Sequence, residues 1–240
     1  MRMRLRLQES DDELDAELLG GVVLPPLPQP VLREMRAEAT AGCTLVLCLI
    51  AFLVASTVGA SHWMSSAVPS ALPVTVVLFE AAVALACLAH LMWGDPGVVR
   101  RTRETVLPLP SEVVEKLSGG AAVSEAAMHP LAGMTNIADG EGRSFCVRCC
   151  VWRDEREPRT SWLTGRRVIR RVKVHHCSTC QRCVRHFDHH CGVFGRCIAG
   201  TWRSGNMPAF GMIILTGYVA FFTTVATCIT AFAVAFPRPT

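Results

Sequence analysis

Residues 175–191 read HHCSTCQRCVRHFDHHC, and this stretch decides what kind of domain the chain contains. Cysteines recur in it at two-residue gaps from Cys177 to Cys183, and a further pair with the same gap lies upstream at Cys146 and Cys149. Thiolate and imidazole are the ligands that tetrahedral zinc prefers, and a two-residue gap lets a tight turn aim two sulfurs at one ion. The block therefore predicts a zinc-binding module.

The number of ligands in this block sets the number of zinc ions. Seven residues outside residues 188–191 have the spacing of ligands: Cys146, Cys149, His176, Cys177, Cys180, Cys183 and Cys197. One of the two adjacent histidines, His189 or His190, brings the set to eight, which suits two four-coordinate structural zinc ions. The spacing chooses neither between these histidines nor between an interleaved and a sequential pairing of ligands.

Cys191 is the thiol that this count leaves over. It follows Asp188 and the two histidines directly. A cysteine beside a histidine and a carboxylate suggests a nucleophile with its general base and the group that orients the base. The plainer interpretation is a structural zinc module with no chemistry attached, and the Asp-His-His-Cys order within the ligand run favours the nucleophile.

Outward from this block the chain is strongly apolar. Half of its 240 residues are apolar and only 18% are charged, and residues 39–79, 81–94 and 204–237 carry no Lys, Arg, Asp or Glu. These runs argue against a wholly soluble enzyme, a coiled coil or a disordered chain. A membrane-spanning helix needs about 20 apolar residues. The sequence therefore predicts an α-helical integral membrane protein with about three spans, at residues 41–60, about 70–93 and about 207–236.

Basic residues give the expected orientation. Five Lys or Arg residues precede the first span, none separates the first two spans, and 18 lie between Arg100 and Arg203. The positive-inside rule therefore places the N-terminus and the cysteine-rich block in the cytosol. Reducing conditions there favour metal binding over disulfides. The basic opening lacks an apolar segment behind it, so no cleaved signal peptide is expected.

Five segments follow from these patterns. We expect a mobile cytosolic tail at 1–40, a transmembrane hairpin at 41–94, a cytosolic linker at 95–144, a zinc domain at 145–205, and a third transmembrane helix with the chain end at 206–240. The linker is expected to be loosely ordered with a short helix near residues 111–117. Residues 150–166, which follow Cys149, are expected to form a surface loop, with Trp152 and Trp162 near the membrane interface.

Residues 145–210 resemble the DHHC cysteine-rich domain of protein S-acyltransferases, the palmitoyltransferases. The resemblance depends on residues 175–191, on Asp95-Pro96-Gly97 directly after the second span, and on Asn206-x3-Phe210 before the third. The family usually carries a fourth span, so the resemblance indicates a divergent or C-terminally truncated member. Gly192-Val193 and Arg196 also differ from that family's usual residues.

The resemblance implies a role for each matched residue. One zinc site would be Cys146, Cys149, His176 and Cys183, and the other would be Cys177, Cys180, His190 and Cys197. The implied catalytic group is Cys191 as nucleophile, His189 as general base and Asp188 as the carboxylate that orients the imidazole.

The implied activity is transfer of a palmitoyl or similar long-chain acyl group from acyl-CoA to cysteines of substrate proteins through an acyl-enzyme on Cys191. Expected partners are membrane lipid, acyl-CoA and proteins with cytosolic cysteines near the membrane, with an accessory subunit left open and no nucleic acid. A basic run that includes Arg170, Arg171 and Lys173 suits CoA phosphates or anionic headgroups. The membrane is expected to be endomembrane (Golgi or ER) or plasma membrane.

Two other functions compete with acyl transfer. One is a catalytically inactive, membrane-anchored zinc module that binds or regulates partners, favoured by the altered residues after Cys191. The other is a RING-like ubiquitin ligase, which fits worse because Asp-His-His-Cys has no purpose there.

Overall fold

The chain forms two compact units. The computed structural model describes residues 21–64, 71–119, 130–161, 164–201 and 204–237. The cysteine-rich unit comprises residues 1–32 and 97–190, and the helical unit comprises residues 33–96 and 191–240. The division falls inside strand β8 (Phe187–Cys191), between His190 and Cys191.

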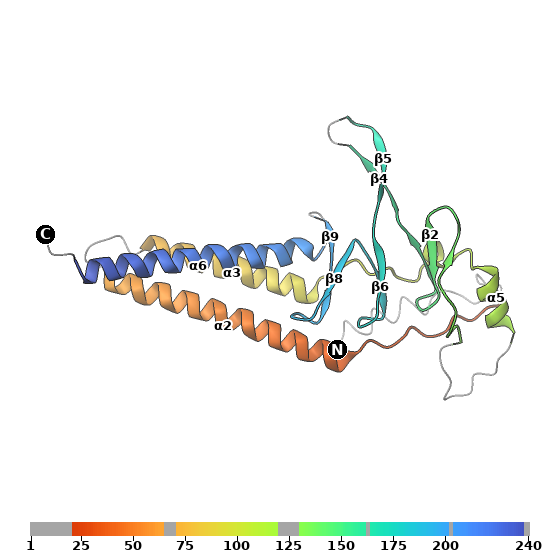
Figure 1. Cartoon of the computed structure of the whole chain (residues 1–240), viewed down its shortest axis with the longest axis horizontal. Helices are drawn as coiled ribbons and strands as arrows, with labels where there is room; N and C mark the ends of the chain where they lie inside the picture. Colours follow the sequence, from red (N-terminus) through yellow and green to blue (C-terminus); the bar gives the residue numbers. More distant parts are fainter. Residues whose placement is uncertain (1–20, 65–70, 120–129, 162–163, 202–203, 238–240) are drawn as a thin grey trace. The chain divides into compact units, whose positions relative to one another are not determined.

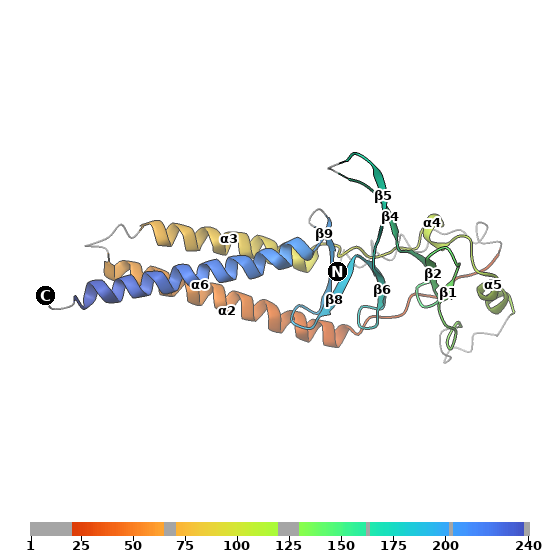
Figure 2. The ribbon, with the colours of Figure 1, turned by 45° about the horizontal axis from the view of Figure 1, so that its top comes forward.

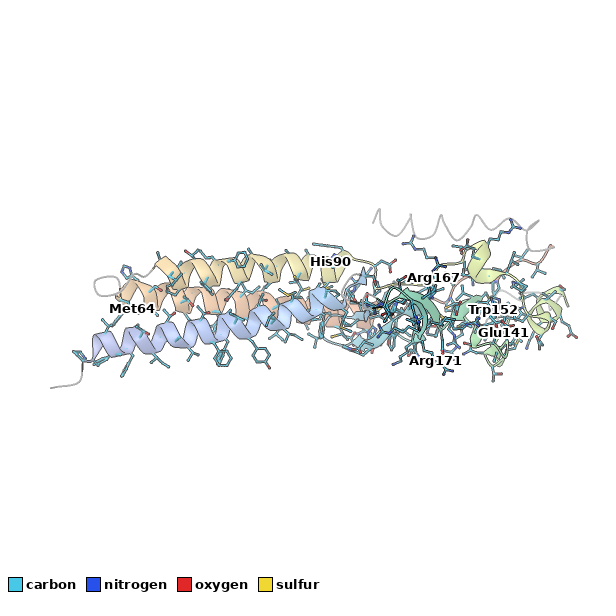
Figure 3. The ribbon with its side chains drawn as sticks, turned by 90° about the horizontal axis from the view of Figure 1, so that it is seen from above. Met64, His90, Glu141, Trp152, Arg167 and Arg171 are labelled. Carbon is cyan, nitrogen blue, oxygen red and sulfur yellow. The ribbon has the colours of Figure 1, made fainter. Side chains whose placement is uncertain are left out.

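Three long helices make up most of the helical unit: α2 (Leu32–Met64), α3 (Ala71–Trp93) and α6 (Met207–Ala235). They run side by side in both views of the ribbon (Figures 1 and 2). Met64 at the end of α2 and His90 near the end of α3 lie at opposite ends of the bundle (Figure 3), as an antiparallel hairpin requires. Each helix is long and apolar enough to cross a membrane.

Packing within the bundle places small and branched side chains inside and large aromatic ones outside. Leu53, Val77 and Ala220 are buried together, and the Thr57 and Thr224 hydroxyls lie 2.9 Å apart across α2 and α6. Phe52 and Phe79 are 66% and 69% exposed. Such faces suit lipid rather than water, because lipid does not penalise exposed apolar surface.

The first helix differs from its prediction. Residues 41–60 were expected to span, but α2 begins at Leu32 and is 33 residues long. Polar residues such as Glu34 and Arg36 are good helix formers and extend the helix beyond the apolar stretch. The other two spans end within one or two residues of the expected positions.

The cysteine-rich unit is built from short antiparallel strands. It contains the three-stranded sheet β1-β2-β3 and the two hairpins β4-β5 and β6-β7. It also contains most of β8, an edge strand of the sheet with the order β10-β9-β8. The strand bounds are β1 Ile137–Ala138, β2 Arg143–Cys146, β3 Val151–Asp154, β4 Arg156–Thr160, β5 Arg167–Arg171, β6 Val174–Cys177, β7 Arg182–Arg185, β8 Phe187–Cys191, β9 Arg196–Thr201 and β10 Ser204–Gly205. Strands β9 and β10 belong to the helical unit.

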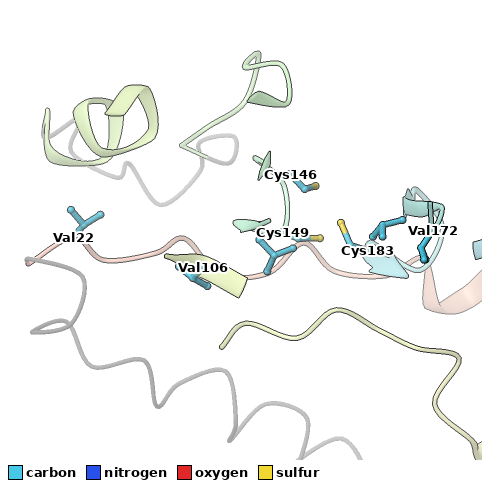
Figure 4. Close-up of a cluster of buried hydrophobic side chains, with 8 residues drawn as sticks. Val22, Val106, Cys146, Cys149, Val172 and Cys183 are labelled. Carbon is cyan, nitrogen blue, oxygen red and sulfur yellow. The ribbon is translucent and has the colours of Figure 1, made fainter. Parts of the chain in front are cut away.

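Residues expected to form a tail and a loose linker are packed against this unit. Residues 1–20 lie outside the described residues, but Val22 is buried in a core with Val106 and Val172 (Figure 4). Arg101 donates to the Pro25 carbonyl at 2.8 Å. The linker contains α4 (Arg103–Val106) and α5 (Ser111–Ser118), and the second confirms the short helix expected near residues 111–117.

Trp152 lies in the core rather than at a membrane interface, which corrects the expectation for this residue. Its side chain is 9% exposed and meets Phe145 edge to face at 5.3 Å between ring centroids. Its indole N–H donates to the Pro108 carbonyl at 2.7 Å. The aromatic pair across β2 and β3 explains the burial, because such cross-strand pairs stabilise short sheets. Trp162 lies outside the described residues.

The fold class is confirmed. The described part of the chain has three apolar helices that could span a membrane, and the cysteine-rich block lies between the second and third of them.

Candidate functional site

The cysteine pairs stand at the tips of β-hairpins. Cys146 ends β2 and Cys149 lies in the turn that leads into β3, and Cys177 and Cys180 occupy the same places between β6 and β7. The residue after each pair, Cys150 (φ 52°) or Gln181 (φ 53°), adopts the left-handed conformation. This conformation turns the chain tightly enough for both sulfurs of a pair to point the same way.

The first ligand group is complete within the cysteine-rich unit. The ligand atoms of Cys146, Cys149, His176 and Cys183 all lie within 4.8 Å of one another, and His176 Nδ1 is 3.2 Å from Cys149 Sγ and 3.7 Å from Cys146 Sγ. Figure 4 shows the sulfurs of the three cysteines converging. His176 Nε2 lies 3.3 Å from Gln181 Oε1, a contact that fixes the ring with Nδ1 turned to the sulfurs.

The protonation of this group fits a cation at its centre. The pKa of Cys146 is lowered, chiefly by hydrogen bonds from Cys149 and Cys183. Burial opposes protonation of His176, but hydrogen bonds to Cys146 and Cys149 outweigh it and raise its pKa to about 10. Sulfurs and an imidazole held this close compete for protons, and a divalent ion bound by three thiolates and one imidazole removes that competition. The residues present therefore fit zinc.

A second ligand group lies partly in the same unit. His190 Nδ1 is 3.5 Å from Cys177 Sγ and 3.3 Å from Cys180 Sγ. These contacts select His190 over His189 as the partner of the two sulfurs. The expected fourth ligand, Cys197, is a buried residue of β9 in the helical unit.

Cys150 is a cysteine of a different kind. It directly follows a ligand pair, but its side chain is fully buried and its thiol lies 3.6 Å from the Val147 carbonyl. Burial raises its pKa to about 11. A thiol that stays protonated is a poor nucleophile and a poor metal ligand. Cys150 is therefore a packing residue.

Asp188 and His189, neighbours in β8, form an ion pair. His189 Nδ1 lies 2.7 Å from Asp188 Oδ2. Both side chains are partly open, at 43% and 57% exposed for His189 and Asp188. A carboxylate on Nδ1 leaves Nε2 of the imidazole to accept a proton.

Cys191 lies at one end of the helical bundle. It is 7% exposed and belongs to a buried cluster with Leu88, Leu91 and Phe194. Its carbonyl accepts hydrogen bonds from the N–H groups of Phe194 and Gly195, at 3.2 and 2.8 Å. The thiol is therefore held in a tight turn with apolar side chains from α3 around it.

Two glycines allow this turn to lie against α2, and no sequence pattern singles them out. A Cβ on Gly42 would overlap the Val193 carbonyl, and a Cβ on Gly195 would overlap the Met35 carbonyl. Gly195 also has a φ of 61°. Side chains at either position would push helix and turn apart.

Asn206 and Arg196 fasten the strand that follows the turn. Asn206, fully buried, donates to the Cys197 carbonyl at 2.8 Å and accepts from the Ala199 N–H at 2.9 Å. Phe210, one helical turn on, meets Phe194 edge to face. Arg196 donates to the carbonyls of Met92 and Gly94 at the end of α3. The arginine that departs from the family pattern thus caps a helix, because cationic donors satisfy C-terminal carbonyls.

The basic run lies on the hairpin β4-β5. All five residues of β5 are exposed, including Arg167, Arg170 and Arg171; Figure 3 labels Arg167 and Arg171 on this element. Residues 158–171 hold five arginines and no acidic residue. The Lys173 ammonium lies 5.2 Å from the ring centroid of Phe187. The charges are therefore available to an anionic ligand.

A cavity lies between the three helices. It is partly open to its surroundings, and its lining is almost wholly apolar. Val46 and Ile213 line it and also pack against the cluster that contains Cys191. Leu53, Val77 and Ala220 also line it and form a buried cluster of their own. The helical unit thus offers an apolar space that shares Val46 and Ile213 with the cluster around Cys191.

These features define a class: a Cys/His domain that could hold metal ions, in a chain with helices that could span a membrane and with an Asp-His pair close to a cysteine. Residues 156–239 match the family model described as DHHC palmitoyltransferase. The chain therefore carries a domain of the DHHC palmitoyltransferase family, as expected from residues 175–191.

Curated proteins agree with this assignment. The chain is 33% identical over 147 residues to the palmitoyltransferase Hip14 of Drosophila melanogaster. This alignment covers 58% of the chain and 17% of Hip14. It is 29% identical over 146 residues to palmitoyltransferase ZDHHC7 of Mus musculus, 60% of the chain and 32% of that protein. It is 32% identical over 133 residues to the probable protein S-acyltransferase 6 of Arabidopsis thaliana, 55% of the chain and 27% of that protein. The matches span less than a third of each relative's length.

Proposed function

We propose that the chain is a protein S-acyltransferase that moves a long-chain acyl group, palmitoyl foremost, from acyl-CoA to cysteine thiols of substrate proteins. The observation that carries the proposal is Cys191, a cysteine outside both ligand groups that directly follows Asp188, His189 and His190. Its buried cluster shares Val46 and Ile213 with the lining of an apolar cavity. Relatives named palmitoyltransferases support it.

The first step acylates the enzyme. His189, oriented by Asp188, takes the Cys191 proton, and the thiolate attacks the thioester carbonyl of acyl-CoA. The bond to the CoA sulfur breaks, and the CoA thiolate leaves with the proton from the imidazolium. Strand geometry supports this pairing, because residues two apart in β8 share a face. General-base assistance of this kind contributes about 10²–10⁴-fold in rate.

The second step transfers the acyl group. A substrate cysteine gives its proton to His189 and attacks the acyl carbonyl on Cys191, and the Cys191 thiolate leaves and regains the proton. One thioester replaces another in each step, so neither step needs an oxidant or a nucleotide. Zinc would supply rigidity at both ligand groups and would take no part in bond making.

The remaining assignments complete the proposal. Cys197 is the fourth ligand of the group formed by Cys177, Cys180 and His190, since tetrahedral zinc needs a fourth donor and β9 follows β8 directly. The cavity takes the acyl chain, each buried methylene contributing about 0.8 kcal/mol. Arg170, Arg171 and Lys173 bind the phosphates of CoA. The excess of basic residues between the second and third helices supports a cytosolic position for the site.

The test is labelling of the full chain. The purified protein in lipid nanodiscs is incubated with alkyne-palmitoyl-CoA, and hydroxylamine-sensitive label is measured for the wild type, Cys191→Ser and Cys150→Ser. We expect the label to vanish in Cys191→Ser and to persist in Cys150→Ser, whose thiol is buried and protonated. Label that survives Cys191→Ser overturns Cys191 as the carrier. A well-folded, zinc-loaded wild type that takes no label supports a catalytically inactive zinc module instead.

A further inference from the structure

Glu80 is an unexpected residue for an apolar cavity. It lies on α3, is 7% exposed and lines the cavity between the three helices. Its Oε2 atom is fully buried and makes no hydrogen bond to any residue that the structure describes. Among the described residues that line the cavity, none is Lys, Arg or His. Ionisable groups inside membrane-spanning helices are costly and are usually retained for a function.

The side chains that line this cavity provide few hydrogen-bond partners for Glu80. Thr216 is the other polar side chain of the lining, but its hydroxyl donates to the Met212 carbonyl of its own helix at 2.8 Å. A buried polar atom left without a partner destabilises a fold. A neutral carboxyl group, by contrast, both donates and accepts hydrogen bonds. The carboxyl group of Glu80 is therefore positioned to hydrogen-bond a polar group of a ligand that fills the cavity.

The position of Glu80 along the helix sets where that group must be. Leu88 packs in the cluster that contains Cys191, and Glu80 is eight residues further along α3, or about 12 Å at the helical rise. Val77, which also lines the cavity, is about 4.5 Å beyond Glu80 along the helix. A chain attached to Cys191 and extended into the cavity would therefore reach Glu80 in its distal half.

We propose that Glu80 makes the cavity selective for long-chain acyl groups that carry a hydroxyl in their distal half. This inference builds on the proposed acylation of Cys191. A hydroxyl at that depth satisfies the Glu80 carboxyl group, whereas a plain chain covers the carboxyl and leaves it without a partner. Sites built to hydrogen-bond a substrate hydroxyl discriminate strongly against the analogue that lacks it.

The test compares acyl donors on the full chain in nanodiscs. Palmitoyl-CoA is set against hydroxypalmitoyl-CoA isomers with the hydroxyl in the distal or the proximal half, and formation of the Cys191 thioester is followed. We expect the distal isomer to exceed palmitoyl-CoA about tenfold in kcat/KM, and the proximal isomer to show no gain.

Two nearly isosteric variants separate hydrogen bonding from size. Glu80→Gln keeps a donor and an acceptor and should retain most of the preference. Glu80→Met removes both and should favour palmitoyl-CoA. Leu78→Met, at a half-exposed position of the same helix, controls for the substitution itself and should keep the wild-type preference.

A binding measurement keeps the inference separate from the proposed activity. Cys191→Ser protein is titrated with the same donors, so selectivity is read without a thioester. Equal affinity for the distal isomer and palmitoyl-CoA, or a preference that Glu80→Met leaves unchanged, overturns the role of Glu80. Selective binding without a thioester on the wild type upholds the role of Glu80 and contradicts the acyl-enzyme alone.

Discussion

The Asp188–His189 pair is the smallest part of the site with a chemical role. The two side chains lie 2.7 Å apart and are partly open to solvent, so the carboxylate can orient the imidazole without taking the proton itself. Neither side chain contributes an atom to the sulfur-rich ligand groups. A substitution in this pair should therefore affect catalysis without removing a metal ligand.

Asp188→Asn tests this separation. We expect the rate of Cys191 acylation to fall about 10²–10⁴-fold, because the amide can hold the imidazole in the wrong tautomer. Zinc content should stay at the wild-type value, since Asp188 is not a ligand. Rates from single-turnover labelling and metal analysis of the same samples provide the check, and a parallel loss of zinc would show that Asp188 acts on the fold instead.

At the scale of elements, the turn after Cys191 depends on its close approach to α2. Gly42 of α2 faces the Val193 carbonyl, and a Cβ there has no room, whereas a Cβ on Gly59 of the same helix meets nothing within 4 Å. These two glycines form a matched pair. One is needed for contact, and the other only lowers helix propensity.

We expect Gly42→Ala to displace the turn and to slow Cys191 acylation at least about tenfold, because a small displacement of a reacting group lowers the reaction rate strongly. Gly59→Ala should leave acylation unchanged and should slightly raise the melting temperature, since alanine is favoured over glycine by about 1 kcal/mol in a helix. Single-turnover labelling and thermal melts of both variants provide the measurement. Equal effects of the two substitutions would contradict the steric argument.

The hairpin β4-β5 is an element with a surface role. Double charge reversal, Arg170→Glu with Arg171→Glu, should raise the KM for acyl-CoA several-fold, and the effect should shrink at high salt because exposed charges are screened. Arg103→Glu, an exposed arginine of α4, serves as the control. A KM that the hairpin variant leaves unchanged would remove these arginines from the CoA site.

The elements differ in how far the sequence predicts them. The three spans and the ligand spacing follow from composition and chemistry, because the bilayer sets a length and zinc sets a geometry. Burial of Trp152 and the packing of residues 21–31 do not, since both depend on contacts distant in sequence, such as Trp152 with Pro108 and Arg101 with Pro25. Glu80 could be noticed as a charge within a span, but its unpaired oxygen requires the structure.

At the scale of the whole molecule, the two units differ in what holds them together. The helical unit buries apolar side chains along three long helices. The cysteine-rich unit combines the short helices α4 and α5 with strands of two to five residues in two- or three-stranded sheets, around small buried clusters. Isolated hairpins of this size are marginally stable in water, and metal binding then supplies folding free energy directly.

Removal of zinc by a strong chelator should therefore unfold one unit and spare the other. We expect limited trypsin digestion after chelation to cut rapidly between Arg100 and Arg185, while α2, α3 and α6 stay helical by circular dichroism. Re-addition of zinc should restore protection with two ions per chain, and Cys197→Ser should restore only about one, because the group of Cys177, Cys180 and His190 would lack its fourth donor. Cys150→Ser, the buried cysteine outside both groups, should still take up two. Chelated protein that resists trypsin as well as the zinc-loaded form would show that apolar packing alone holds the cysteine-rich unit.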